Sequence, residues 1–158
     1  MLEDLLQKNK TAISECWLEL TLNSYQGDAN DFFKLQDNRF ANPVGQTLAR
    51  ETRALLDELL ADMDPERLCT HLEEIIRIRA VQEFTPAKAV SFVFLLKDAI
   101  RAQLGDEAKD HGTREELRAI DTRVDQLALF AFDVYVMCRE KVFSLRLNEI
   151  RKGYVNPA

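Results

Sequence analysis

The segment from Arg114 to Lys152 contains neither proline nor glycine, and this uninterrupted run limits the folds open to the chain. Both residues are poorly tolerated inside helices, so their absence over such a length favours one long helix. At 1.5 Å per residue, a straight helix here would be roughly 60 Å long. A compact domain of this chain length is only about 40 Å across. We therefore expect the helix either to kink or to project beyond the rest of the domain.

Prolines and glycines divide the rest of the chain into helices. Asn42-Pro43, Asp64-Pro65 and Thr85-Pro86 each join a capping residue to a proline suited to the first helical turn. Thr113-Arg-Glu-Glu116 fits a capping box, and Gly27, Gly105 and Gly153 mark expected helix ends. Apolar spacings of three and four residues predict helices over about 2–25, 29–37, 43–62, 65–82, 86–104 and 113–152. The predicted fold is all-α, a six-helix bundle with a long C-terminal helix.

The helix predicted over 86–104 is apolar around most of its circumference. Val90, Phe94 and Leu95 lie outside its main apolar stripe. A helix of this kind is normally surrounded by other helices, so we expect it at the centre of the bundle.

The long helix carries two apolar faces. One is a seam with a heptad spacing, formed by Leu117, Ile120, Val124, Leu127, Ala131, Val134, Cys138 and Leu145. A second apolar set comprises Phe130, Phe132, Val136, Phe143, Leu147 and Ile150. One face can cover the domain's own core while the other meets a second subunit, or both can lie in the chain's own core. We predict a homodimer whose interface draws on Val124, Leu127, Phe130, Ala131, Val134, Val136, Cys138 and Phe143.

Composition limits the class of protein. A chain of 158 residues with 46% apolar and 30% charged residues is expected to form one globular domain, over 1–152, followed by a tail at 153–158. A net charge of −6 argues against a nucleic-acid surface. The longest apolar run, at 92–96, is far shorter than the ~20 residues of a membrane span. Cys16, Cys69 and Cys138 form no C-x-x-C pair, so we expect reduced thiols in a cytoplasmic protein.

The sequence contains no motif for catalysis or metal binding, so we predict neither an enzyme nor a cofactor. Two histidines are present, and we read His111 as a solvated loop residue. His71 lies at the edge of the apolar face of the helix at 65–82, where the proximal ligand of a haem globin would be. A globin-type haem or gas sensor using His71 is therefore the alternative hypothesis. Arg79, beside the same face, is expected to extend its charged end to solvent.

Two segments resemble a known family. Residues 39–48 (RFANPVGQTL) and 77–97 (RIRAVQEFTPAKAVSFVFLLK) are similar to the N-terminal domain of RsbRD-type RsbT co-antagonists, the sensory subunits of the bacterial stressosome. The opening of the chain, with Leu5, Leu6, Ile13 and Trp17, is similar as well, and the resemblance spans roughly 2–140.

The resemblance implies a helical signal-input domain. Related input domains have a globin-like fold without haem and form dimers, and in full-length relatives this domain precedes a phosphorylatable STAS domain. With 158 residues, we expect this chain to be a stand-alone input domain. We predict a non-catalytic regulatory module that acts by contacting a protein partner, with sensing of a small ligand as a further role. No site residue is carried over from the family.

Overall fold

The computed structural model describes residues 1–24, 43–81 and 85–155, and within these ranges the secondary structure is helical, with no strand. The predicted all-α fold is confirmed. The α-helices are α1 (Leu2–Lys8), α2 (Lys10–Asn23), α4 (Pro43–Leu60), α5 (Pro65–Val81), α6 (Pro86–Val90), α7 (Leu95–Leu104) and α8 (His111–Val155), with short 3₁₀ turns η1 (Ser91–Val93) and η2 (Gly105–Lys109). The helix predicted near 29–37, Gly27 and Asn42 lie outside the described residues.

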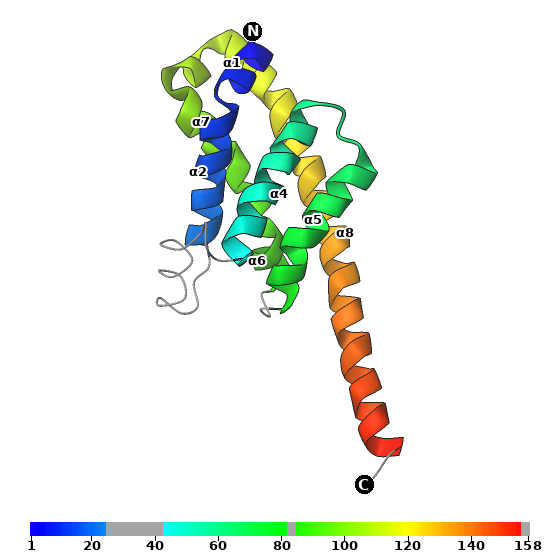
Figure 1. The fold of residues 1–158 in the computed structure, drawn as a ribbon. Helices are drawn as coiled ribbons and strands as arrows, with labels where there is room; N and C mark the ends of the chain where they lie inside the picture. The colour runs from blue at the N-terminus through cyan, green and yellow to red at the C-terminus, as the bar shows by residue number, and fades with distance from the viewer. Residues whose placement is uncertain (25–42, 82–84, 156–158) are drawn as a thin grey trace.

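The long C-terminal helix projects from the bundle. The first part of α8 lies along α5 and the core, and its C-terminal end extends well past the other helices (Figure 1). This confirms the expectation that a helix of this length must leave the domain or bend. Gly153 does not end it, because α8 continues to Val155. Near a fraying terminus, a glycine costs little helical stability.

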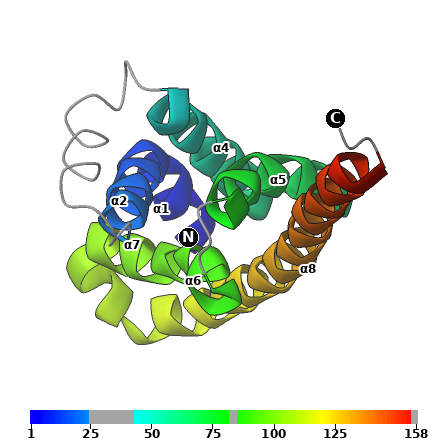
Figure 2. The same ribbon diagram turned by 90° about the horizontal axis from the view of Figure 1, so that it is seen from below.

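The core lies between α2, α4, α5, α7 and α8, and Figure 2 shows these helices around it. Because each helix carries its apolar residues on one side, packing that side inward removes the residues from water. The apolar positions predicted for the helices at 65–82 and 86–104 are buried: Leu68, Leu72, Ile75, Ile76, Ala89, Phe92, Val93, Leu96, Ile100 and Leu104.

The prediction of one central helix over 86–104 is wrong. The segment is divided into α6, η1 and α7, and Phe94 is 44% exposed. Carbonyl groups of this segment accept hydrogen bonds from side chains: the Lys88 carbonyl from Arg79 Nη2 (2.8 Å) and the Phe92 carbonyl from Trp17 Nε1 (2.7 Å). Side chains that take carbonyls from the helical ladder are a recognised cause of a break in a helix.

Arg79 is buried, contrary to the expectation that its charged end reaches solvent. It is 1% exposed, and its guanidinium lies over the Phe92 ring, 5.3 Å from the centroid. The stacking contact and the bond to the Lys88 carbonyl compensate part of the cost of burying this charge.

Helices begin at Pro43, Pro65 and Pro86, as predicted, and the structure describes the capping residue before two of them. Asp64 Oδ1 accepts from the Glu66 N–H (3.0 Å), and Thr85 Oγ1 accepts from the Lys88 N–H (3.2 Å). The capping box predicted at Thr113 is wrong, because α8 begins at His111 and Asp110 Oδ2 accepts from the Thr113 N–H (3.3 Å).

The single helix predicted over 2–25 is divided into α1 and α2 at Asn9. The Asn9 side chain donates to the Leu5 carbonyl (2.8 Å) and so competes with the backbone for that acceptor.

Candidate functional site: the exposed face of the C-terminal helix

One face of α8 belongs to the chain's own core. Leu117, Val124, Leu127, Ala131, Val134 and Cys138 of the seam are buried among residues of the other helices. Five residues of the predicted dimer interface therefore lie inside the monomer: Val124, Leu127, Ala131, Val134 and Cys138. In this conformation they cannot contact a second subunit. The seam ends at Cys138 because α8 then leaves the bundle, and Leu145 is exposed.

A second face of α8 exposes apolar side chains from Leu129 to Ile150. We call it the outer stripe and define it as Leu129, Phe132, Val136, Phe143, Leu147 and Ile150, all of which are exposed. At 100° per residue these six positions fall within an arc of about 60° on the helix surface. The outer stripe contains Val136 and Phe143 of the predicted interface, whereas Phe130 is half-buried and packs against the core.

Leu129 was missed in the sequence interpretation, although it is 69% exposed and lies seven residues before Val136. The heptad relation Leu129, Val136, Phe143 and Ile150 is the signal that could have found it.

The outer stripe continues onto the projecting end of α8. From Phe143 to Gly153 every residue is exposed, so the rest of the domain does not bury this part of the helix. Isolated helices shorter than about 12–15 residues are marginally stable in water. An exposed apolar face on such a helix therefore favours contact with another surface.

Four cavities open on the surface of the described residues. A cavity of about 600 Å³ lies between α7, η2 and the start of α8, and one of about 530 Å³ lies on the projecting end of α8. A cavity of about 350 Å³ lies between α1, α4 and α8, and one of about 310 Å³ lies beside Met63 and α8.

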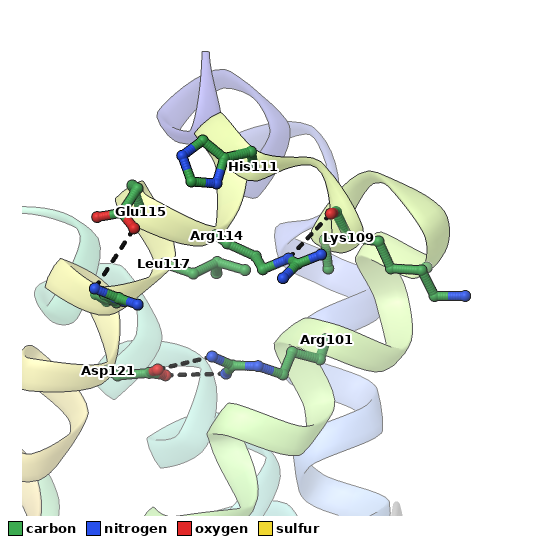
Figure 3. A pocket seen from close by; sticks show the side chains of 10 residues that line it. Arg101, Lys109, His111, Arg114, Glu115, Leu117 and Asp121 are labelled. Atoms are coloured by element: carbon green, nitrogen blue, oxygen red, sulfur yellow. Dashed lines mark hydrogen bonds and ion pairs between the residues drawn. The ribbon is translucent and has the colours of Figure 1, made fainter.

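The cavity of about 600 Å³ is lined by basic side chains that already have acidic or carbonyl neighbours (Figure 3). Arg101 donates two hydrogen bonds to the Asp121 carboxylate (2.9 and 2.7 Å), and these bonds are the main cause that raises the pKa of Arg101. Arg118 lies 3.5 Å from Glu115, and Arg114 Nε donates to the Lys109 carbonyl (3.0 Å). The charges are thus largely compensated within the chain. His111 lies on this rim as the first residue of α8 rather than in the predicted loop.

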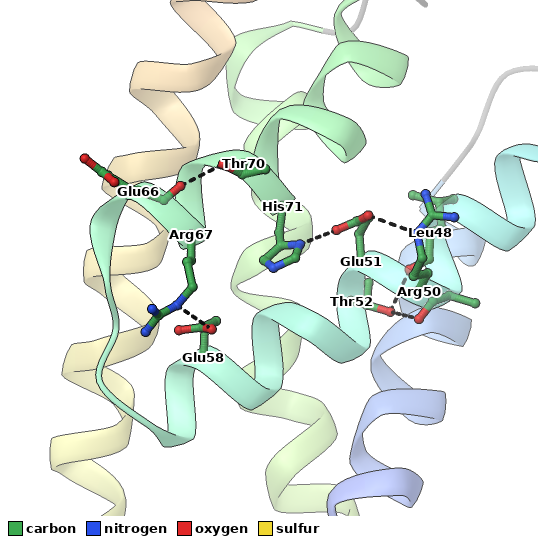
Figure 4. Close-up of polar contacts among 10 residues, drawn as sticks. Leu48, Arg50, Glu51, Thr52, Glu58, Glu66, Arg67, Thr70 and His71 are labelled. Atoms are coloured by element: carbon green, nitrogen blue, oxygen red, sulfur yellow. Dashed lines mark hydrogen bonds and ion pairs between the residues drawn. The ribbon is translucent and has the colours of Figure 1, made fainter.

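His71 joins α5 to α4 (Figure 4). Its Nδ1 lies 2.5 Å from Oε2 of Glu51, a carboxylate buried on α4 that also accepts from Arg50 Nε (3.1 Å). None of the four cavities above is lined by His71. The geometry at His71 therefore gives the haem hypothesis no support. It remains a prediction, tested by adding haem and asking whether a sharp Soret band forms and is lost in His71→Ala.

The described residues contain no group of three or more His, Cys, Asp and Glu side chains arranged to hold a metal ion. Burial raises the pKa of the Cys69 and Cys138 thiols, with nearby Asp133 and Glu73, respectively, as further causes. A raised pKa lowers the fraction of reactive thiolate at neutral pH. Among the described residues, no helix is sufficiently long and apolar to cross a bilayer.

Comparison with known proteins identifies a family. The model of the RsbT co-antagonist protein rsbRD N-terminal domain matches residues 11–150. The comparison with curated proteins and that with solved structures give no match.

Proposed function

Because the chain belongs to the RsbT co-antagonist protein rsbRD N-terminal domain family, a family of regulatory signalling domains, we propose that it is a non-catalytic signal-input domain that works through protein contacts on the outer stripe. The first of these contacts is with a second copy of the chain. A regulatory protein partner and a cytoplasmic location are further parts of this proposal. The observation that carries it is the exposed apolar face that extends from Leu129 to Ile150.

The position of the outer stripe suits a signalling role. The same helix contributes Val124, Leu127 and Ala131 to the core, where it lies against α5. A change in how the bundle packs would therefore shift α8 as a whole and move the outer stripe with it. A signal acts in this way if it binds one packing arrangement more tightly than the other. Sensing of a small ligand remains a prediction, because the four cavities indicate no preferred site.

Two residues of equal exposure provide a matched test. Phe143 belongs to the outer stripe and is 64% exposed, whereas Leu145 is 63% exposed and lies about 160° away around the helix. We expect Phe143→Asp to weaken self-association because it places a charge in the interface, and Leu145→Asp to leave it unchanged. Light scattering of the full chain at micromolar concentration measures both.

The proposal requires wild type to be a dimer and Phe143→Asp to shift it toward a monomer with unchanged helical circular dichroism. A monomeric wild type would overturn the homodimer. Equal loss of association in Leu145→Asp would show that the outer stripe is not the contact surface.

A further inference from the structure

Two ion pairs join α7 to the first half of α8. Arg101 donates two hydrogen bonds to the Asp121 carboxylate (2.9 and 2.7 Å), and Lys97 Nζ donates to Asp125 Oδ1 (2.7 Å). On each helix the two charged residues are four positions apart, so the pairs lie one turn from each other. We call these four residues the charge ladder. Because α7 supplies both bases and α8 both acids, each pair draws the same two helices together.

Apolar packing between α7 and α8 is interrupted beside the charge ladder. The buried face of α7 packs mainly against α2. The cavity of about 600 Å³ lies between α7 and α8, and Figure 3 shows Arg101 and Asp121 meeting across the space between the helices. Atoms that line a cavity lack van der Waals partners on that side. The charge ladder therefore holds α7 against α8 where apolar contact is incomplete.

The turn that connects the two helices can act as a hinge. None of the described residues of η2 (Gly105–Lys109) is buried, so the core does not fix their position. Gly105, at the junction of α7 and η2, has a φ of 57°, a backbone conformation that glycine adopts without strain. A change in the angle between α7 and α8 therefore exposes no buried side chain at the turn.

The side chains of the charge ladder are 26% to 54% exposed, so dissolved ions reach them. Attraction between charges at such positions is weakened by salt. We propose that the charge ladder is a clasp sensitive to ionic strength, which holds α7 against α8 at low salt and releases it at high salt. Ionic strength is then a signal that the chain registers through its own packing.

The clasp rests on the proposed function only for its consequence. Because α8 also carries the outer stripe, a change in its contact with α7 alters how that surface is presented. The clasp itself lies within one chain and requires no second copy. Exposed ion pairs are individually weak, so release shifts a balance between two arrangements and does not unfold the domain.

Distances between spin labels measure the opening in the full chain. Noncanonical residues that accept the label replace Ala102 on α7 and Thr122 on α8, which are both exposed, and leave the native cysteines unlabelled. Excess unlabelled protein restricts the measurement to distances within one chain. Raising NaCl from about 0.02 to about 0.5 M shortens the Debye length from about 20 to about 4 Å. We expect the ratio of long to short distances to rise about two- to fivefold.

Reversing the charges of α7 reverses the expected response. In Lys97→Glu/Arg101→Glu, acids face Asp121 and Asp125, so the helices should lie farther apart at low salt. Added salt then screens a repulsion and should bring them closer together. Adding Asp121→Arg and Asp125→Lys to this variant restores opposite charges and should restore the wild-type response. Helical circular dichroism checks that each variant is folded.

Two controls separate the clasp from general effects of salt and charge. Sucrose at the osmolality of the NaCl solution screens no charge and should leave the distances unchanged. Lys10→Glu reverses a charge in the ion pair between α2 and α4, in which Lys10 Nζ lies 2.8 Å from Asp57, and should leave the response of α7 and α8 unchanged.

Wild-type distances that do not change with NaCl, or that change equally with sucrose, would overturn the inference. The same holds if Lys97→Glu/Arg101→Glu opens further with salt, or if Lys10→Glu alters the response as strongly as that variant does. Light scattering reports the proposed homodimer separately. A monomeric wild type whose label distances still lengthen with salt would overturn the homodimer and support the clasp.

Discussion

The indole Nε1 of Trp17 on α2 donates a 2.7 Å hydrogen bond to the backbone carbonyl of Phe92, which lies between α6 and α7. The two rings are stacked with their centroids 6.1 Å apart. Arg79 of α5 lies over the ring of the same phenylalanine. Phe92 thus joins α2 and α5 at the point where the helical ladder of its own segment is interrupted.

Trp17→Phe is expected to destabilise the fold by about 2–4 kcal/mol. The smaller ring leaves a cavity in the core, and the Phe92 carbonyl loses its donor in a buried site. Urea unfolding followed by circular dichroism measures the change, because Trp17 is the only tryptophan and its fluorescence is lost in the variant. Glu19→Gln, an exposed change on the same helix, is the control and should alter the free energy of unfolding by less than about 0.5 kcal/mol.

Most of the helix pattern could be predicted from the sequence because it depends on local chemistry. Proline in a first helical turn requires no particular tertiary partner, so Pro65 and Pro86 indicated the starts of α5 and α6 directly. The break after Val90 could not be predicted, because it depends on donors from Trp17 and Arg79, which lie far away in the sequence. Periodicity alone predicts a continuous helix there.

Asp110→Ala is expected to cost about 1 kcal/mol of unfolding free energy, because it removes the side chain that caps α8. Thr113→Ala should cost less, although the sequence pattern gave Thr113 the capping role. Both are measured by urea unfolding. An equal or greater effect of Thr113→Ala would contradict the assignment of the cap to Asp110.

The two apolar faces of α8 could be predicted from the sequence, but which of them is exposed could not. Apolar periodicity identified both the seam and the second set, but it does not specify which face meets the other helices. Val124 and Val136 are the same residue type on the same helix, yet the first is buried and the second is 38% exposed. Their difference arises from the docking of α5 against one side of α8, which is a tertiary property.

Cys138 is expected to react slowly with iodoacetamide in the folded protein. Burial raises its pKa above the ordinary value, so the folded state holds the neutral thiol to higher pH than the unfolded chain does. The resulting stabilisation is fully present below the unfolded pKa of about 8.5 and is lost as pH rises through the folded pKa. Peptide mapping after timed alkylation should show that Cys138 reacts faster in urea than in native buffer. Equal rates in the two conditions would show that the thiol is not protected.

Glu73 on α5 is expected to contribute stability that disappears in acid. A hydrogen bond from Arg77 is the main cause that lowers the Glu73 pKa, and Lys141 of α8 adds to the effect (3.0 and 3.6 Å). A carboxyl whose folded pKa lies below its unfolded value of about 4.3 stabilises the fold above that unfolded value, and the contribution is lost as pH falls through the folded pKa. Since Glu73 is more than one-third exposed, solvent screening limits the contribution to about 0.5 kcal/mol.

The Glu73→Gln variant should therefore be slightly less stable than wild type at pH 7 and equally stable near pH 3, as measured by urea unfolding at both pH values. A Glu73→Gln deficit that persists at pH 3 would mean that the lost stability is packing rather than charge.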